Sequence, residues 1–276
     1  MSSSQSPSRT PSGIAYDRAG PPSGTPVVLL HAGIADRRMW DPQWAALTAV
    51  HDTVRLDLRG FGGSDRAPTG SLDPVADVLD TLDHLGIAAC HLVGSSLGAG
   101  VGVEIALTRP DAVRSLLLAP PGGSLLTERT PAFAAFAATE NAAMARGDLD
   151  AAVDADITAW VVGEGRTLAD VDPTVVSAVR AMQRGAFEID AAWADPDLDA
   201  VHLDPPAVER LGDLSAPVLL VLGGHDLDIV HLATGTLEAG LRDVRRVDRP
   251  DVAHLPSMEE PEEFLQLLLD WVTVQG

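Results

Sequence analysis

The pentapeptide at 94–98, Gly-Ser-Ser-Leu-Gly, has the residue types and spacing of a turn that exposes a nucleophile. An apolar run at 90–93 precedes it, and a helical pattern that reaches Thr108 follows it. Strand, G-x-S-x-G turn and helix in this order form a nucleophile elbow, which holds a serine hydroxyl clear of the backbone. Glycines on both sides let the strand and the helix pass close together. The motif therefore predicts Ser96 as the nucleophile, with Ser95 only preceding it.

A serine hydroxyl at neutral pH needs a base, and the base needs a carboxylate that orients it. Behind an elbow of this kind the acid comes next in the chain and the histidine last. Asp226 follows an apolar run at 218–222 and a Gly-Gly turn, and Asp228 is the nearby alternative. His254 lies in a loop before the last predicted helix. We predict a triad of Ser96, Asp226 and His254, because Asp226 is the first acid after the turn.

Acyl transfer also needs two N–H donors for the oxyanion of the tetrahedral intermediate. The backbone N–H of Leu97, at the start of its helix, is the predicted first donor, since the helix dipole favours negative charge there. The second donor is expected in the loop after the apolar run at 27–30. We assign it to Gly33, to within one residue.

Short apolar runs alternate with helical patterns along the chain, which is typical of a parallel sheet covered by helices on both faces. The predicted strands are 27–30, 53–56, a run that ends at 93, 113–118, 218–222 and 244–247. The predicted helices are 40–50, 73–85, 97–108 and 261–274. We therefore expect an α/β fold with a mainly parallel, doubly wound sheet.

The alternation stops between 120 and 214, where the sequence is alanine-rich and helical. We expect this stretch to be a helical lid inserted between two strands of a core formed by 13–119 and 215–276. Most of its aromatic side chains are expected in the lid's own core, with one or two facing a substrate pocket: Phe133, Phe136, Trp160, Phe187 and Trp193. The polar, Ser/Pro-rich stretch at 1–12 predicts a disordered tail.

The chain of 276 residues carries 40 acidic and 19 basic residues, a formal charge of -21, and all the basic residues are arginine. This charge disfavours nucleic acid and anionic membranes as partners, and chemistry that needs a lysine is excluded. The single cysteine, Cys90, allows no intrachain disulfide and no cysteine-rich metal site. No apolar run resembles a signal peptide or a transmembrane helix, so a cytoplasmic protein is expected.

Five segments, in the same order, resemble the motifs of the α/β-hydrolase fold superfamily. They are LLHAGIADRRMW (29–40), DLRGFGGSD (57–65), GSSLGAG (94–100), GGHD (223–226) and AHLPSMEEPEEF (253–264). The resemblance covers everything except the tail and the lid, and Ala32 stands where the family usually has glycine. It implies a structural role for the 57–65 turn, and Ser96 excludes the branches that use an aspartate nucleophile.

Within that superfamily, the segments at 59–62 and 77–79 are most similar to 3-oxoadipate enol-lactonases and small carboxylesterases. The resemblance implies a serine hydrolase that cleaves an ester or lactone through an acyl-enzyme, with no metal or organic cofactor. Two alternatives on the same triad are C–C bond hydrolysis and perhydrolysis. A third is a non-hydrolytic ligand-binding or biosynthetic accessory protein. The expected partner is a small-molecule substrate, and the sequence leaves the oligomeric state open.

Overall fold

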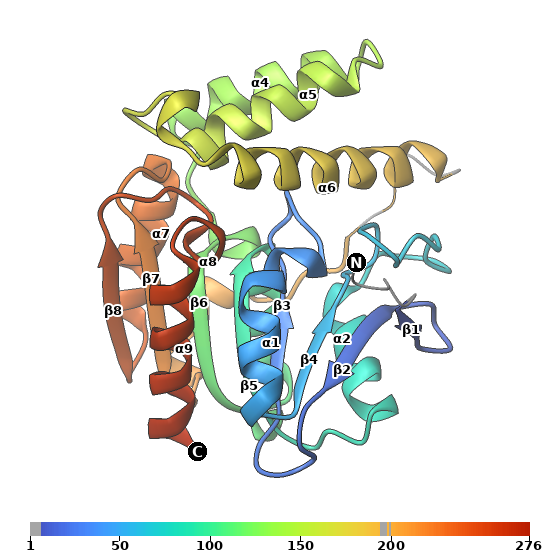
Figure 1. The fold of residues 1–276 in the computed structure, drawn as a ribbon, viewed down its shortest axis with the longest axis vertical. Helices are drawn as coiled ribbons and strands as arrows, with labels where there is room; N and C mark the ends of the chain where they lie inside the picture. The colour runs from blue at the N-terminus through green and yellow to red at the C-terminus, as the bar shows by residue number, and fades with distance from the viewer. Residues whose placement is uncertain (1–6, 194–197, 199) are drawn as a thin grey trace.

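An eight-stranded sheet forms the centre of the protein, with strand order β1-β2-β4-β3-β5-β6-β7-β8 (Figure 1). The computed structural model describes residues 7–193, 198 and 200–276. The strands from β4 to β8 run parallel, whereas β1 and β2 join the edge antiparallel. The strands are β1 (Ser8–Arg9), β2 (Ala15–Ala19), β3 (Val27–Leu30), β4 (Thr53–Leu56), β5 (Cys90–Ser96), β6 (Val113–Pro121), β7 (Val218–Gly223) and β8 (Val244–Arg249).

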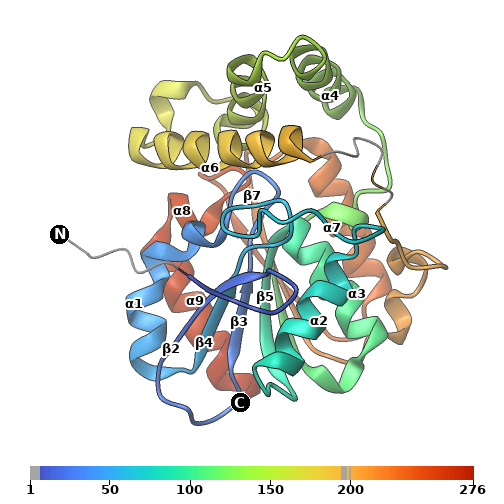
Figure 2. The same ribbon diagram turned by 90° about the vertical axis from the view of Figure 1, so that its right-hand side faces the viewer.

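Helices cover both faces of this sheet, because its central strands are apolar on both sides. Along β3, Val27 and Leu29 belong to one hydrophobic cluster, and Val28 and Leu30 belong to the other. Figure 2 shows α1 and α9 on one face and α2, α3 and α7 on the other. The helices are α1 (Asp41–Val50), α2 (Pro74–His84), α3 (Leu97–Thr108), α7 (Asp228–Gly240), α8 (Pro256–Glu259) and α9 (Pro261–Gln275), with short turns η1 (Arg37–Trp40) and η2 (Pro110–Ala112). The predicted α/β class with a mainly parallel, doubly wound sheet is confirmed.

The structure differs from the predicted disordered tail at 1–12. Residues 1–6 lie outside the described residues, but Ser8 and Arg9 pair with β2. The Thr10 hydroxyl then accepts a hydrogen bond from the backbone N–H of Ile14 at 3.0 Å. Hydrogen bonds to a sheet edge and within a turn thus order a segment that its polar composition alone would leave unfolded.

The described part of the insertion between β6 and β7 is helical, and its helices α4, α5 and α6 lie over the edge of the sheet where the parallel strands end (Figures 1 and 2). Its elements are η3 (Gly123–Leu125), α4 (Pro131–Met144), α5 (Leu149–Asp156), the π-helix η4 (Ile157–Val162), η5 (Leu168–Asp170), α6 (Pro173–Ala192), η6 (Ala207–Glu209) and η7 (Leu211–Asp213). The helical character expected for this region is present. Whether the insertion acts as a lid over a substrate stays a prediction.

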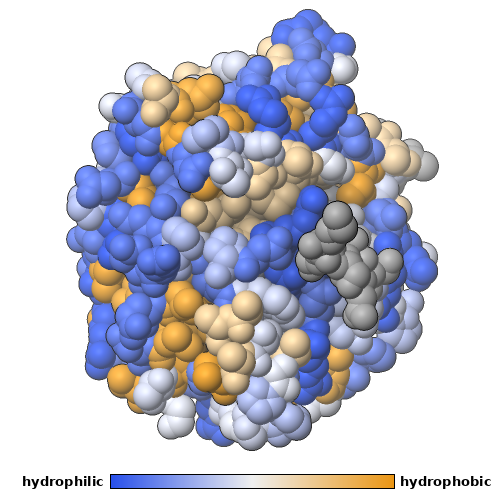
Figure 3. All heavy atoms as spheres, viewed as in Figure 1, coloured by the Kyte–Doolittle hydropathy of each residue, from blue (hydrophilic) through white to orange (hydrophobic). Residues whose placement is uncertain are grey.

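Hydrophilic residues predominate on the face drawn in Figure 3, with smaller apolar groups among them. This surface fits the charge of -21, which comes from an excess of carboxylates. Within the described ranges, no helix combines the length and the apolar character that crossing a bilayer requires.

Candidate active site

Ser96 sits at the junction of β5 and α3 in a strained backbone conformation. Its φ of 50° is the one positive value among the described residues other than glycine. A Cβ on Gly94 would lie 2.4 Å from the carbonyl oxygen of Gly98, and a Cβ on Gly98 would lie 2.5 Å from that of Leu30. Only glycine fits at both positions without a shift of the backbone. This is the local geometry of a nucleophile elbow, which stores strain to expose the side chain.

His254 and Asp226 form a buried pair at the ends of two neighbouring strands. Asp226 follows β7 and His254 follows β8, and their residues are 1% and 2% exposed. The Nδ1 of His254 lies 2.8 Å from Oδ2 and 2.9 Å from Oδ1 of Asp226. The same carboxylate accepts the backbone N–H of Leu227 at 2.9 Å. This arrangement fixes the ring and leaves Nε2 as the free nitrogen of the imidazole.

Asp228, the alternative acid, has different partners. Its Oδ1 accepts a hydrogen bond from the Thr130 hydroxyl at 2.7 Å and from the N–H of Ile229 at 2.8 Å. It therefore links the start of α7 to the helical insertion, and His254 pairs with Asp226 instead.

Ser96 and the pair lie at the same sheet edge, since β5, β6, β7 and β8 are adjacent parallel strands. Among the described residues, no hydrogen bond joins the Ser96 hydroxyl to His254. In enzymes without substrate this contact is often long and shortens only in the complex.

The two predicted oxyanion donors are neighbours in space. A Cβ on Gly33 would lie 3.7 Å from the Cβ of Leu97. The N–H of Gly98 donates to the carbonyl oxygen of His31 at 3.1 Å, which fixes the loop after β3 against the start of α3. Gly33 thus lies close to the side chain of Leu97, the residue that follows Ser96.

His31 is a structural residue of this edge, which the sequence did not indicate. Its Nε2 lies 2.9 Å from the backbone N of Leu58, and its Nδ1 lies 2.8 Å from the carbonyl oxygen of Ala32. Burial lowers the pKa of His31, so the neutral ring donates through Nδ1 and accepts through Nε2. One side chain thereby joins the loops after β3 and β4.

The turn at 57–65 has the structural role that the resemblance implied. The buried carboxylate of Asp57 accepts the N–H of Gly63 at 2.6 Å and that of Arg37 at 2.8 Å. It also pairs with the Arg37 guanidinium at 2.6 Å. The loops after β3 and β4 are held together by this carboxylate.

Residues of the helical insertion contact the histidine loop directly. The ring of Trp160 lies 4.5 Å from that of His254, and its carbonyl oxygen accepts the N–H of His254 at 3.2 Å. Trp160 belongs to the π-helix η4, and π-helical turns are frequent at functional sites. The insertion therefore contributes to the position of the imidazole.

A second link joins Arg166 of the insertion to the loop that carries His254. Arg166 pairs with Glu259 at 2.7 Å, with both side chains under 10% exposed, and donates to the carbonyl oxygen of Asp251 at 2.9 Å. Glu259 also accepts the N–H of Ala253 at 2.9 Å. Burial raises the pKa of the Glu259 carboxyl, while Arg166 favours its charged form. No local pattern in the sequence indicates this pair, because its two residues are far apart in the chain.

A cavity of about 430 Å³, the Gly33 cavity, lies between the helical insertion and the loops after β3 and β4. Its volume is that of a small-molecule site. Residues that line it include Gly33, Phe61, Glu140, Gln183, Phe187 and Trp193. Phe187 and Trp193 are thus the two insertion aromatics that face this cavity, whereas Phe133 and Trp160 pack against each other with ring centroids 6.3 Å apart.

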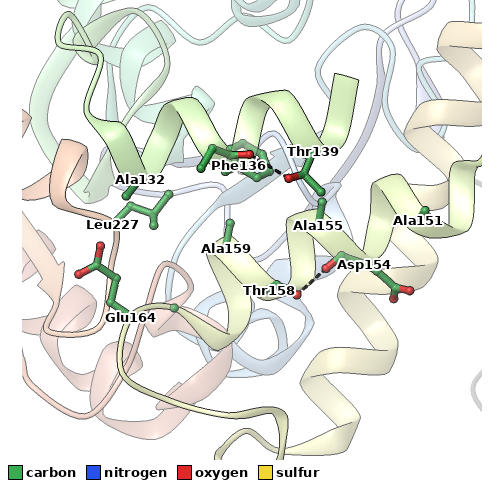
Figure 4. A pocket seen from close by; sticks show the side chains of 12 residues that line it. Ala132, Phe136, Thr139, Ala151, Asp154, Ala155, Thr158, Ala159, Glu164 and Leu227 are labelled. Atoms are coloured by element: carbon green, nitrogen blue, oxygen red, sulfur yellow. Dashed lines mark hydrogen bonds between the residues drawn. The ribbon is translucent and has the colours of Figure 1, made fainter. Parts of the chain in front are cut away.

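A second cavity of about 550 Å³, the Phe136 cavity, lies within the insertion between α4, α5 and Leu227 (Figure 4). Five of its twelve lining residues are alanine, and the wall carries the ring of Phe136. The Phe136 ring packs at 5.3 Å from Trp160, which in turn lies against His254. Two aromatic rings therefore separate this cavity from the imidazole.

Two carboxyl groups, one buried and one half-buried, meet where α4, α5 and α6 pack together. Asp156 is 1% exposed, and its side chain hydrogen bonds with Glu140 and accepts Nε2 of Gln183 at 2.8 Å. Burial, and then the charge of Glu140, raise the pKa of Asp156 to about 8. Burial also raises the pKa of Glu140. The two groups therefore share a proton at neutral pH.

Asp156→Asn is expected to flatten the loss of stability between pH 5 and pH 8. The pKa of Asp156 is higher in the folded protein than in the unfolded chain. The stabilisation that the protonated carboxyl contributes is therefore complete below the unfolded pKa and is lost as the pH rises through the folded pKa of about 8. Asparagine does not titrate but can still donate to Glu140 and accept from Gln183. We expect the free energy of unfolding, measured with urea, to fall less between pH 5 and pH 8 in the variant than in the natural protein, by on the order of 2 kcal/mol.

The matched control is Asp154→Asn, which removes an exposed carboxylate from the same helix, α5. It is expected to keep the pH dependence of the natural protein. An unaltered slope in the Asp156 variant would contradict the shared proton.

No group of three or more His, Cys, Asp or Glu side chains in the described part of the chain is placed to hold a metal ion.

Comparison with known proteins places the chain among hydrolases. A model of the alpha/beta hydrolase family matches residues 27–267. A protein named putative carbamate hydrolase RutD, from Variovorax paradoxus, is 30% identical over 93% of this chain and 95% of its own length. The 3-oxoadipate enol-lactonase 1 of Acinetobacter baylyi is 26% identical over 92% of this chain and 90% of its own length.

Solved structures show the same fold. The enol-lactonase from Burkholderia xenovorans LB400 superposes with a TM-score of 0.74 at 22% identity, covering 94% of this chain and 96% of that one. The family match spans the elbow, the Asp226 loop and the His254 loop. The chain is therefore a hydrolase that belongs to the alpha/beta hydrolase family.

Proposed function

We propose that the protein is a serine hydrolase that cleaves a carboxylic ester or lactone through an acyl-enzyme. The observation that carries the proposal is the buried pair of Asp226 and His254 at the sheet edge where β5 turns sharply at Ser96. A base held by a carboxylate at the same sheet edge as a partly exposed serine is the arrangement that activates a hydroxyl for acyl transfer. The position of Gly33 close to Leu97 supports these two residues as the oxyanion donors.

In this mechanism the Ser96 oxygen attacks the carbonyl carbon while Nε2 of His254 takes its proton. Asp226 orients the imidazole and stabilises its charged form. The backbone N–H groups of Leu97 and Gly33 stabilise the oxyanion, each by about 3 kcal/mol. The alcohol leaves with the proton from His254, and a water molecule, deprotonated by the same nitrogen, releases the acid and restores Ser96.

We further propose that the helical insertion, expected at 120–214, is a lid that contributes the wall of the substrate site. Trp160 and Arg166 of the insertion contact the loop that carries His254. These contacts support the role, because a movement of the insertion would then also affect the position of the catalytic imidazole. The core that it covers comprises 13–119 and 215–276.

Two relatives suggest substrate classes for the test. One is named an enol-lactonase, which favours lactones as well as esters. The other is named a putative carbamate hydrolase, which favours carbamates as a second candidate. All of these substrates present an acyl carbon to the same nucleophile.

The test combines covalent labelling with a substrate panel. A fluorophosphonate is expected to add one equivalent to the protein, and fragmentation of the labelled peptide should locate the adduct on Ser96. 4-Nitrophenyl acetate, a γ-lactone and an aryl carbamate are then assayed, and the best substrate should slow the labelling. Labelling elsewhere, or no turnover in the whole panel, would contradict the proposed function.

A further inference from the structure

One residue on the wall of the Gly33 cavity carries a hydrogen-bond acceptor that the described residues leave unused. Gln183 lines the cavity and is 4% exposed, yet its Oε1 meets no donor among the described residues. Glu140 lines the same wall. A buried carbonyl oxygen without a donor costs free energy, so a ligand that supplies a donor gains by satisfying it.

Asp156 fixes which atoms of these two side chains are available. It accepts Nε2 of Gln183 at 2.8 Å, which turns Oε1 of the amide away from it. Burial raises the pKa of Asp156 to about 8 and also raises the pKa of Glu140, so at neutral pH the two carboxyl groups share one proton and carry one negative charge between them. Gln183 and Glu140 thus lie on the wall of one cavity, and Oε1 of Gln183 has no donor among the described residues.

The remaining charges around the cavity favour a cation. Arg59 lines the wall, but its guanidinium is held by both oxygens of Asp77, one of them at 2.7 Å. Asp190 adds a second carboxylate to the wall, and the rings of Phe61 and Trp193 supply aromatic faces that attract cations. The net charge of -21 acts in the same direction.

We propose that the Gly33 cavity binds a protonated amine carried by the substrate, with Glu140 and Gln183 accepting its N–H groups. The inference rests on the proposed function and narrows it to amino-substituted esters, lactones or carbamates. An ammonium group supplies a positive charge that can pair with Glu140 and an N–H donor for Oε1 of Gln183. A neutral or anionic group would supply only one of these or neither.

The test compares benzylammonium with benzyl alcohol, a neutral molecule of the same size, by calorimetry at pH 7 and 0.15 M salt. Benzylammonium is expected to bind about tenfold more tightly than benzyl alcohol, the ratio expected for one charge-assisted hydrogen bond. Benzyltrimethylammonium, which has the charge but no N–H, is expected to bind more weakly than benzylammonium.

Two variants and a matched control assign the effect to the cavity. Glu140→Gln and Gln183→Met are each expected to reduce, several-fold, the ratio of the dissociation constant of benzyl alcohol to that of benzylammonium. Glu188→Gln removes a carboxylate from the same helix as Gln183, but on an exposed side chain outside the cavity wall. It is expected to keep the ratio, which separates a local contact from the overall field.

The proposal would be overturned if benzyl alcohol and benzylammonium had nearly the same dissociation constant in the natural protein. It would also be overturned if both cavity variants kept the ratio of the natural protein. Equal binding of benzyltrimethylammonium would also overturn it, because the N–H donors would then contribute nothing. Turnover of 4-nitrophenyl acetate and fluorophosphonate labelling are measured on the same preparations. If the protein turns over the ester but does not prefer benzylammonium to benzyl alcohol, the amine site alone is refuted. If it prefers benzylammonium but shows neither turnover nor labelling, the proposed function alone is refuted.

Discussion

Replacing Ser96 with alanine is expected to lower kcat/KM for an ester about a millionfold, to the residual rate that binding and the oxyanion donors alone support. The hydroxyl is the only atom removed, so the Cβ and the packing around the elbow are kept. Alanine meets the same backbone constraint at a φ of 50° as serine does. The free energy of unfolding should therefore change little, and kcat/KM and urea unfolding are measured on the same preparation.

Ser95→Ala is the matched control for this experiment. Ser95 is fully buried, and its hydroxyl has no hydrogen-bond partner among the described residues. Its removal is expected to leave kcat/KM within a few-fold of the natural protein. If Ser95→Ala abolished turnover and Ser96→Ala did not, the nucleophile would be misassigned.

The parallel part of the fold was predictable because its strands are buried on both faces. Such strands are continuous apolar runs, and β3 and β4 span the predicted residues, 27–30 and 53–56. The antiparallel edge was missed because β2 has the sequence AYDRA, whose polar residues break the apolar run that marks a buried strand. β1 has only two residues, and its pairing with β2 depends on a neighbour rather than on its own composition.

The predicted chemistry followed from local motifs, whereas the contacts around it did not. An elbow, an acid after a strand and a histidine before a helix each have a signal in the adjacent sequence. The pair of Arg166 and Glu259 bridges 93 positions, and the contact of Trp160 with His254 bridges a similar distance. No local sequence pattern indicates either contact, because both depend on how the insertion packs on the sheet.

The carboxyl groups of Glu140 and Asp156 illustrate the same limit. In the sequence both belong to helical segments that look like ordinary solvent-exposed faces. Only the meeting of α4, α5 and α6 buries Asp156 and brings it to Gln183. A buried acid of this kind is a property of three packed helices, so no single helix pattern could indicate it.

Asp226→Asn is expected to lower kcat about ten-thousandfold with little change in KM. The amide can still accept the N–H of Leu227, but its NH₂ group faces Nδ1 of His254 and favours the tautomer with the proton on Nε2. That nitrogen then cannot take the proton of Ser96. Because the lost interaction is with the base and not with the substrate, binding should survive, and steady-state kinetics on an ester measures both constants.

Asp228→Asn separates this effect from the general loss of a carboxylate at the start of α7. Asp228 bonds Thr130 and the N–H of Ile229 but not His254, so its change is expected to cost stability of about 1 kcal/mol and leave kcat near that of the natural protein. A ten-thousandfold loss in this variant, with normal kcat in Asp226→Asn, would transfer the orienting role to Asp228. A loss in neither would mean that His254 acts as the base without an orienting carboxylate.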